Sequence, residues 1–321
     1  MARIGLVLGA GGMVGHAYHA GVLAALQQEL GWDARRAELI VGTSAGSGVA
    51  ALLRAGMPPV DLRARASGAS LSPEGEAVAA RAGLPAGTFP VLRPSFDFTA
   101  GMAAPARLLA AARRPWNARL GTVAAAVLPA GQVSPELVAA PFRPLFDTWP
   151  GDGLWICAVD LDRGERVVFG RAGAPSVTVA DAVAASCAIP GFFEPVTIDG
   201  ARYVDGGAHS PTNLDVLGGQ SLDLVIVSSS MSASRGAPRP APDLAARRLF
   251  RLYLTREAAV MRRRGVPVVA FQPSTDDRMV MGTNAMDPDR RGPVADQVFA
   301  TTRRRLRRPE LQRSLTLLNS R

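Results

Sequence analysis

Leu39-Ile40-Val41-Gly42-Thr43-Ser44-Ala45-Gly46 is the stretch that decides the fold, because an apolar run leads there into the pattern G-x-S-x-G. This pattern is typical of a nucleophile elbow, in which a strand turns sharply into a helix and presents a serine hydroxyl above the sheet. Gly42 and Gly46 give the backbone the room that such a turn needs. We therefore expect Ser44 to be a nucleophile, followed by a helix that ends near Arg54.

A second glycine-rich turn lies upstream, between the apolar run 4–8 and an expected helix from Gly15 to Leu30. Successive glycines at such a place expose backbone N–H groups at the positive end of a helix, where they can stabilise an oxyanion. A dinucleotide-binding loop looks similar, but the glycine spacing differs and the next strand leads into the elbow instead of an acidic residue. The candidate donors are Gly9, Gly11, Gly12 and Gly15.

The base that would activate Ser44 has few candidates, because the chain has only 3 histidines. In an ordinary α/β-hydrolase the histidine comes late in the chain and the nucleophile follows several strands. Here the serine follows the second expected strand, and no histidine follows His209. His16 and His19 fall in the first helix, where we expect structural roles.

Asp205 is the stronger candidate for the base. A β-hairpin is expected over residues 196–204 with Asp199-Gly200 as its two-residue turn, and it delivers Asp205-Gly206-Gly207. The two glycines allow a tight turn that leaves the carboxylate unshielded. Desolvation would raise the basicity of this carboxylate enough for it to take a proton from a serine hydroxyl.

The organisation of the chain indicates an α/β protein. Strands alternate with helices over residues 1–57, which predicts a parallel sheet with helices on its faces. Residues 58–150 are interrupted by prolines and glycines and form a candidate insertion of short helices and loops. The alternating pattern returns at residue 154, residues 232–321 are expected to be mainly helical, and we expect one domain over residues 1–321. Large apolar side chains of the insertion either hold it against the core or line an acyl-chain groove: Phe89, Phe96, Phe98, Met102, Trp116, Phe142, Phe146 and Trp149.

Composition limits the class of protein. The 321 residues are 48% hydrophobic, which is ample for a large core, and no apolar run is long enough to predict a membrane-spanning helix. No signal-peptide pattern opens the sequence, so we expect a cytoplasmic protein. Cys157 and Cys187 lie in apolar segments without metal-ligand spacing. We expect them to be buried free thiols, and we expect no metal and no cofactor.

The net charge is +9, and the chain contains arginine but no lysine. Clusters at 262–264 and 303–308 could attract anionic lipid headgroups, which would bring the protein into peripheral contact with an anionic membrane. The alternative is a solvated helix face with no special affinity. Because aromatic residues make up only 6% of the chain and no nucleic-acid-binding motif is recognisable, no nucleic-acid partner is expected.

The order of glycine loop, elbow and Asp-Gly-Gly resembles the patatin-like phospholipase family, over residues 4–57 and 154–230. The resemblance implies a three-layer α/β/α fold with a mostly parallel central sheet. It also implies hydrolysis of acyl esters, usually of lipids, by a Ser-Asp dyad without histidine. The nucleophile falls on Ser44 and the dyad aspartate on Asp205. The oxyanion hole falls on Gly11 and Gly12, and the supporting loop and motif residues are Gly9, Gly15, Gly42, Gly46, Gly206 and Gly207.

One departure from the family pattern lies in the glycine loop, which commonly reads G-G-G-x-R-G. Here Val14 stands where the arginine would fall, and Ala10 replaces a glycine. Catalysis by backbone N–H groups could survive both changes. Loss of the arginine predicts a changed preference for anionic or phosphate-bearing substrates, so an acyl ester is the firmer expectation.

We expect a serine acyl hydrolase that cleaves fatty-acyl esters of lipids, similar to a phospholipase A or a lysophospholipase, through an acyl-enzyme on Ser44. The altered loop leaves a second possibility, a lipid-binding or regulatory protein that retains the fold without useful turnover. A third is an α/β-hydrolase with an unusual triad, which would require five or more strands before the elbow.

Overall fold

A central, mostly parallel sheet organises the computed structural model, which describes residues 2–83, 103–104, 120–234 and 243–318. Five strands run parallel in the order β3-β2-β1-β7-β8. Strand β4 pairs antiparallel with the outer edge of β3, and β6, with β5 beside it, pairs antiparallel with the end of the edge that β2 occupies. The strands are β1 (Ile4–Leu8), β2 (Leu39–Thr43), β3 (Leu154–Asp160), β4 (Glu165–Phe169), β5 (Val196–Ile198), β6 (Ala201–Asp205), β7 (Leu224–Ser228) and β8 (Val268–Phe271).

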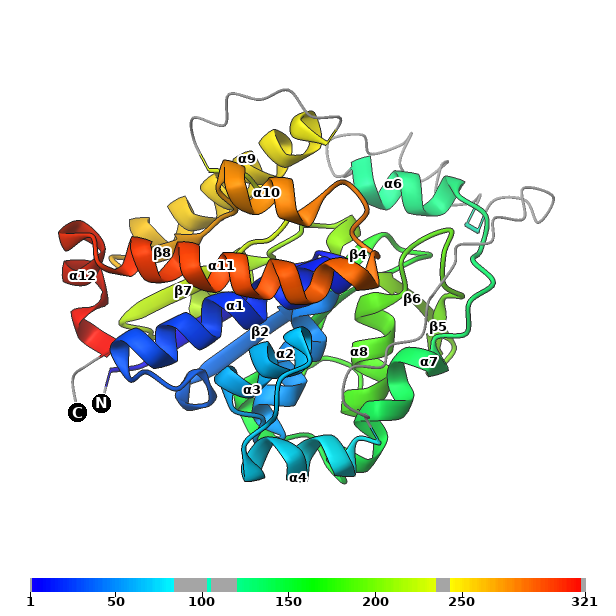
Figure 1. Ribbon diagram of the computed structural model, residues 1–321. Coiled ribbons are helices and arrows are strands. Elements are labelled where there is room, and N and C mark those ends of the chain that lie inside the picture. Colours follow the sequence, from blue (N-terminus) through cyan, green and yellow to red (C-terminus); the bar gives the residue numbers. More distant parts are fainter. Residues whose placement is uncertain (1, 84–102, 105–119, 235–242, 319–321) are drawn as a thin grey trace.

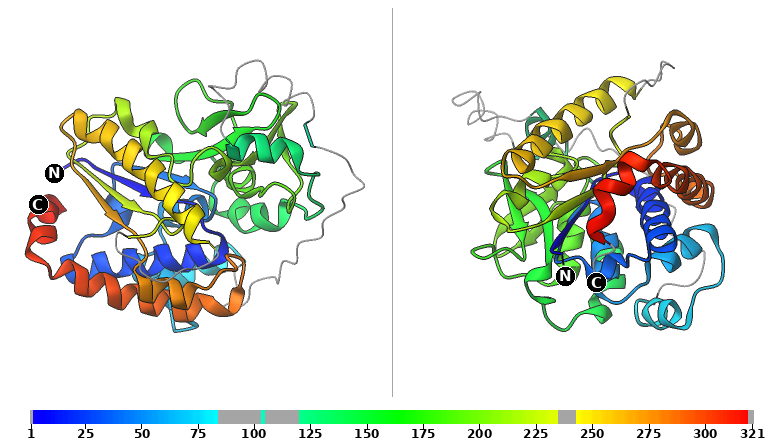
Figure 2. Two further views of the ribbon diagram at one scale, coloured as in Figure 1. Left: turned by 90° about the horizontal axis from the view of Figure 1, so that it is seen from above. Right: turned by 90° about the vertical axis from the view of Figure 1, so that its left-hand side faces the viewer.

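Helices cover both faces of this sheet (Figures 1 and 2). Alternate strand residues face opposite ways, so Leu6 and Leu8 pack with one set of helices, whereas Val7 packs with the other. The first face carries α1 (Gly12–Leu30), α2 (Ala45–Arg54), α3 (Pro59–Ser67), α8 (Val179–Cys187) and α11 (Arg291–Leu306). The second face carries α9 (Leu244–Arg263). The expected three-layer α/β/α fold is thus confirmed.

Shorter helices complete the described chain. In the segment 58–150, α3 packs against α1 and α11, and α4 (Pro73–Arg81), α6 (Leu120–Val127) and α7 (Glu136–Ala139) follow. Phe142 is buried, and Phe146 and Trp149 are partly buried against the core, so these three side chains anchor the segment. The apolar residues expected at 89, 96, 98, 102 and 116 lie outside the described residues. The C-terminal part contains α10 (Thr275–Met281), α11 and α12 (Pro309–Leu315).

Local predictions differ from the structure mainly at helix starts. The hairpin of β5 and β6 turns at Asp199-Gly200, as expected. The first helix begins at Gly12, three residues earlier than expected, because Gly12 takes a φ of 61° that turns the chain at once into the helix. Gly15 therefore lies in the first turn of α1 and not in the loop. Strands β1 and β2 precede the elbow in the described chain. The α/β-hydrolase alternative requires five or more preceding strands, so it is excluded.

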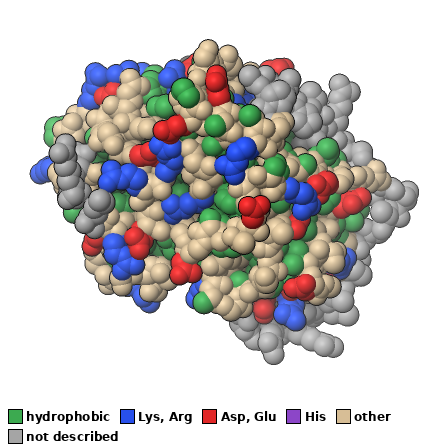
Figure 3. Space-filling model, turned by 90° about the horizontal axis from the view of Figure 1, so that it is seen from below, with side chains coloured by type: hydrophobic (Ala, Val, Ile, Leu, Met, Phe, Trp, Pro, Cys, Tyr) green, Lys and Arg blue, Asp and Glu red, His purple; other side chains and the backbone are tan. Residues whose placement is uncertain are grey.

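The surface of the described chain is mixed in charge. On the face shown in Figure 3, basic side chains are interspersed with acidic ones and with small apolar patches. Among the described residues, no helix is both long enough and apolar enough to cross a membrane.

Candidate active site

Ser44 occupies a strained turn between β2 and α2. Its φ of 52° and ψ of −123° are rarely adopted by a residue other than glycine, and this strain is typical of a nucleophile elbow. Gly46 permits the turn because a Cβ at that position would overlap the carbonyl oxygen of Leu8 in the neighbouring strand. The side chain of Ser44 is consequently held at the carboxyl end of the sheet, 4% exposed, with its hydroxyl toward a cavity.

Ser186 in α8 holds the elbow in place. Its hydroxyl accepts a hydrogen bond of 2.9 Å from the Ser44 backbone N–H and donates one of 2.6 Å to the Cys157 carbonyl in β3. On the helix side, the Ser47 hydroxyl donates to the Ser44 carbonyl at 2.6 Å. The backbone of the nucleophile is therefore tied to a strand and two helices, which is the preorganisation that a catalytic serine needs.

Strand β3 brings Asp205 next to Ser44. Along one edge of β3, Thr43 pairs with Cys157, and Asp205 pairs with the next residue, Ala158. The pairing of β4 with residues 156–160 occupies the opposite edge. Strands β2 and β6 therefore meet end to end on the same edge, and the last residue of β6 lies beside the residue that follows β2. Gly206 allows this approach, since a Cβ there would overlap the Cys157 carbonyl.

Burial makes Asp205 an unusually basic carboxylate. Its side chain is 5% exposed, and desolvation raises its pKa from 3.8 to about 6. Hydrogen bonds from the Ser44 hydroxyl and from the Gly207 N–H, the latter at 2.7 Å, oppose this rise by stabilising the charged form. The carboxylate is thus mostly ionised at neutral pH and lies in contact with the serine hydroxyl, as a general base requires.

Four glycines are expected as hydrogen-bond donors to an oxyanion. In the described part of the chain, the N–H groups of two of them already donate to backbone carbonyls, and the N–H groups of the other two have no acceptor there. Gly9 N–H donates to the Ser228 carbonyl at 3.0 Å, and Gly15 N–H donates to the Gly11 carbonyl at 2.8 Å. No such bond is found in that part for the N–H groups of Gly11 and Gly12, at the amino end of α1. Gly12 lines the same cavity as Ser44, whereas Gly11 lines a second, smaller cavity.

The two departures in this loop have structural roles. Val14 is 2% exposed in the core, and its N–H donates to the Ala285 carbonyl at 3.0 Å. Ala10 N–H donates to the Pro211 carbonyl at 2.7 Å, and the Ala10 carbonyl accepts the Ser230 hydroxyl at 2.7 Å. An arginine side chain at position 14 would have to replace an apolar one in the core. The loop is therefore held by the segments around it without the family's arginine.

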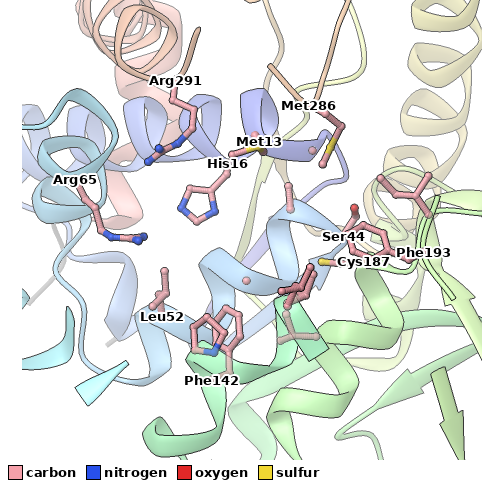
Figure 4. Close-up of a pocket in the computed structure, with 18 residues that line it drawn as sticks. Met13, His16, Ser44, Leu52, Arg65, Phe142, Cys187, Phe193, Met286 and Arg291 are labelled. Carbon is pink, nitrogen blue, oxygen red and sulfur yellow. The ribbon is translucent and has the colours of Figure 1, made fainter. Parts of the chain in front are cut away.

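A cavity of about 210 Å³ opens beside Ser44 (Figure 4). Its walls come from α1, α2, α3, α7, α8 and α11, and most of them are apolar. Leu52 and Phe142 line one side, and Cys187, Phe193 and Met286 lie with Ser44 toward the other end in Figure 4. Such a chamber suits a hydrocarbon chain attached to a carbonyl group at Ser44.

Three basic side chains line the same cavity away from Ser44, namely His16, Arg65 and Arg291 (Figure 4). Burial and the charges of both arginines hold the pKa of His16 well below its usual range. His19, by contrast, is a core residue that bridges the Ser228 hydroxyl and the Gly9 carbonyl at 2.7 Å each, and burial lowers its pKa to about 4. Sequence reasoning missed both arginines, because neither belongs to a motif.

The expectation for the cysteines is half right. Cys157 is a buried free thiol, but Cys187 is only partly buried and lines the cavity, with Sγ 3.7 Å from the Ser47 hydroxyl. The difference arises because Cys187 is the last residue of α8, the helix that also carries Ser186 to the elbow. Desolvation and the nearby Asp205 raise the pKa of Cys187 to about 12, so the thiol stays protonated.

The comparison with protein-family models agrees with the sequence resemblance. The family model "Patatin-like phospholipase" matches residues 6–123 and 152–217, together more than half of the chain. Among solved structures, VipD from Legionella pneumophila is 13% identical with a TM-score of 0.42, over 99% of this chain and 67% of that one. The type III effector protein ExoU is 17% identical with a TM-score of 0.36, over 98% of this chain and 54% of that one. This chain therefore spans about half the length of ExoU. On the extent of the family match, the chain belongs to the patatin-like phospholipase family.

Proposed function

We propose that this protein is a serine acyl hydrolase that cleaves fatty-acyl esters of lipids, in the manner of a phospholipase A or a lysophospholipase. The observation that carries the proposal is the meeting of Ser44 with a buried, ionised Asp205 beside an apolar cavity. Family membership supports a lipid ester as the substrate class. Peripheral contact with an anionic membrane and a cytoplasmic location stay predictions.

In the proposed acylation, the Asp205 carboxylate takes the proton of the Ser44 hydroxyl while Oγ forms a bond to the ester carbonyl carbon. The carbonyl oxygen becomes an oxyanion, which the N–H groups of Gly11 and Gly12 and the positive end of α1 stabilise. The tetrahedral intermediate then breaks its bond to the leaving alcohol. That alkoxide takes the proton from Asp205, and an acyl-enzyme remains on Ser44.

In the proposed deacylation, Asp205 is again ionised and acts on water. It takes one proton from a water molecule while the water oxygen bonds to the acyl carbon. The same N–H groups stabilise the second oxyanion. When the bond to Oγ breaks, the proton returns from Asp205 to Ser44, and the fatty acid leaves. Each proton removed is thus returned, and the enzyme is restored.

Hydrolysis of a chromogenic fatty-acyl ester by purified Ser44→Ala protein tests the proposal. We expect the variant to lose at least about 10³-fold in kcat/KM, because the nucleophile is gone. Asp205→Asn should lose nearly as much, because the amide cannot accept the proton. A covalent fluorophosphonate probe should label wild-type protein and leave the Ser44→Ala protein unlabelled.

His209→Ala is the matched control for Asp205→Asn. His209 lies four residues beyond Asp205 in the same turn but does not line the cavity, so its removal should leave most of the activity. Equal losses in the two variants would instead support a triad. If wild-type protein neither hydrolyses the ester nor reacts with the probe, the alternative of a lipid-binding protein without turnover is favoured.

A further inference from the structure

A buried asparagine joins the two chain segments that carry Ser44 and Asp205. The Asn213 side chain is fully buried, and its Nδ2 donates to Thr43 Oγ1 at 3.1 Å and to the Gly206 carbonyl at 3.3 Å. Thr43 directly precedes Ser44 in the chain. Gly206 directly follows Asp205. One amide group therefore bonds to a neighbour of the nucleophile and to a neighbour of the proposed base.

The groups around Asn213 fix the orientation of its amide. Nδ2 also donates to the Ser210 carbonyl at 2.7 Å. Oδ1 accepts a hydrogen bond of 3.1 Å from Arg166 in β4, and Arg166 forms an ion pair of 2.6 Å with Asp215. If the amide were turned over, its oxygen would face two carbonyl oxygens and its NH₂ group would face a guanidinium group. The surroundings therefore allow one orientation, in which the NH₂ group points to both strand ends.

The backbone that carries Asn213 is also held in place. Asn213 has a φ of 49° and a ψ of 28°, a left-handed conformation that asparagine adopts more readily than most residues. Glu257 in α9, which is 6% exposed, accepts hydrogen bonds from the Ser210 hydroxyl at 2.5 Å and from the Leu214 N–H at 2.9 Å. Helix α9 thus fixes the loop on both sides of Asn213, although it covers the face of the sheet opposite to α2.

Asn213 spans a break between two strands. Strand β2 ends at Thr43 and β6 ends at Asp205, both on one edge of β3, and strands that meet end to end share no ladder hydrogen bonds. A side chain that bonds to both ends limits how far they can separate. The hydrogen bond from the Ser44 hydroxyl to Asp205 depends on this separation. In catalysis, a displacement of about 1 Å between reacting groups can cost about 10²-fold in rate.

We propose that Asn213 is a positioning residue, which holds Ser44 and Asp205 at the separation that proton transfer between them requires. This inference rests on the proposed function, because it concerns the same pair of residues. Asn213 is not among the described residues that line the cavity, so its loss should slow the reaction without weakening substrate binding. When the two strand ends move apart, the Asp205 carboxylate also loses a hydrogen bond that favours its charged form. The pKa of Asp205 then rises above about 6.

Asn213→Gly tests the inference, because glycine keeps the left-handed backbone conformation and removes the amide. We expect kcat for a chromogenic fatty-acyl ester to fall about 10²-fold while KM changes less than about twofold. The midpoint of the pH dependence of kcat/KM should rise by about half a pH unit or more. An unchanged kcat overturns the proposal. A fall in kcat with an unshifted midpoint also overturns it, because general damage to the fold would suffice to explain such a fall.

Thr212→Val is the matched control. Thr212 is a buried residue of the same loop, but its hydroxyl donates to Glu257 at 2.7 Å. Its removal leaves the other two hydrogen bonds to Glu257 in place, so kcat should stay within about threefold of the wild-type value and the pH midpoint should not shift. Equal effects of Thr212→Val and Asn213→Gly would show that the loop as a whole matters, which overturns the role assigned to the amide.

Variants of Thr43 test the path through which Asn213 acts. Thr43→Val removes the acceptor of one amide bond and should reproduce part of the loss in kcat, whereas Thr43→Ser keeps a hydroxyl and should retain the activity. Protein that carries both Thr43→Val and Asn213→Gly should lose about as much as Asn213→Gly alone, because both changes break the same link. Losses that multiply would mean that the two residues act independently, and they contradict the proposal.

A second measurement does not require turnover, namely titration of the Asp205 carboxyl by carbon-13 NMR, with its signal assigned from Asp205→Asn protein. Ser44→Ala should raise the pKa of Asp205 by removing the hydrogen bond from the serine hydroxyl, and Asn213→Gly should raise it as well. In Ser44→Ala protein, Asn213→Gly should add little, because no such hydrogen bond is left to lengthen. The Cys187 thiol, which interacts with Asp205 from the end of α8, stays protonated over this pH range. Additive shifts overturn the positioning role even in a fully active enzyme. The expected shifts in a protein that hydrolyses no ester would contradict the proposed function alone.

Discussion

Asp205 is the residue whose ionisation sets the pH range over which Ser44 can react. Because burial raises its pKa to about 6, the carboxylate is protonated in mild acid and cannot accept the serine proton. We therefore expect kcat/KM for a neutral ester to rise with pH through about 6 and to level off above about 7. A pH–rate profile on a soluble short-chain ester measures this. Activity that stays level down to pH 4 would show that another group is the base.

The same burial means that ionised Asp205 lowers the free energy of unfolding. A carboxyl whose pKa is higher in the folded state binds its proton more tightly there, so the free energy of unfolding falls as pH rises from about 4 through about 6. Asp205→Asn removes this cost and keeps an amide oxygen that can accept the hydrogen bond from the Gly207 N–H. We expect the variant to gain about 1–3 kcal/mol of stability at pH 7.5 and little at pH 4. Denaturant unfolding at both pH values tests this, and a loss of stability at pH 7.5 contradicts it.

Local sequence patterns indicate Ser44 and Asp205 as candidate residues, but they do not indicate which other side chains surround these two. Ser44 and Asp205 follow from glycine-flanked motifs, because short-range backbone geometry dictates those glycines. Arg65 and Arg291 lie in no motif, and they meet only because α3 and α11 both pack against α1. The departure at Val14 predicted a changed preference for phosphate. The structure places two arginines from other helices in the cavity beside Ser44, which a motif comparison cannot detect.

At the scale of elements, strand β3 matters most for the site, because it pairs with both β2 and β6. These pairings could not be predicted from the sequence. The apolar run at 154–159, the hairpin and the elbow were each predictable from alternation and turn residues. That β2 and β6 share one edge of β3 depends on long-range pairing, which leaves no local pattern. The early start of α1 was not predicted either. Glycines such as Gly11 and Gly12 are typical of loops, and only their backbone angles show that the helix begins at Gly12.

Two glycines of α2 offer a matched test of the elbow. A Cβ at Gly46 would overlap the Leu8 carbonyl, whereas a Cβ at Gly48 would meet only the Phe142 ring, at 3.4 Å. We expect Gly46→Ala to destabilise the protein by about 3 kcal/mol or more, because the strand and the helix must separate. Gly48→Ala should raise the free energy of unfolding by about 0.5–1 kcal/mol through helix propensity. Denaturant unfolding measures both, and similar effects of the two substitutions would contradict the close approach at Gly46.

At the scale of the whole molecule, the two basic clusters lie at the end of the sheet opposite to Ser44. Ser44 follows the carboxyl end of β2, whereas residues 262–264 end α9 and lead to the amino end of the parallel strand β8. Helix α11 starts at the cavity with Arg291 and extends about 20 Å before it reaches the second cluster. A membrane bound at these clusters would therefore face away from the cavity. Attachment there and access of lipid to Ser44 are separate properties of the molecule.

The two clusters also differ in how far their charges are already engaged. Arg303 and Arg307 form ion pairs with Glu29 at the end of α1, and Arg305 is partly buried. The arginines at 262–264 are exposed, so we expect this cluster to carry most of any attraction to anionic vesicles. Replacing all three by glutamate should weaken vesicle binding about a hundredfold, since each basic residue near the surface contributes about 1 kcal/mol.

Vesicle cosedimentation at low and high salt measures that attraction. The matched control replaces three scattered, exposed arginines by glutamate (Arg163, Arg171 and Arg248), which changes the net charge equally. Local attachment requires a strong effect of the first variant and a weak effect of the second, and binding should fall as salt screens the charges. Equal weakening would mean that only net charge attracts the vesicles. Binding that does not respond to salt, or no binding to anionic vesicles at all, would rule out electrostatic attachment and leave 262–264 as a solvated end of α9.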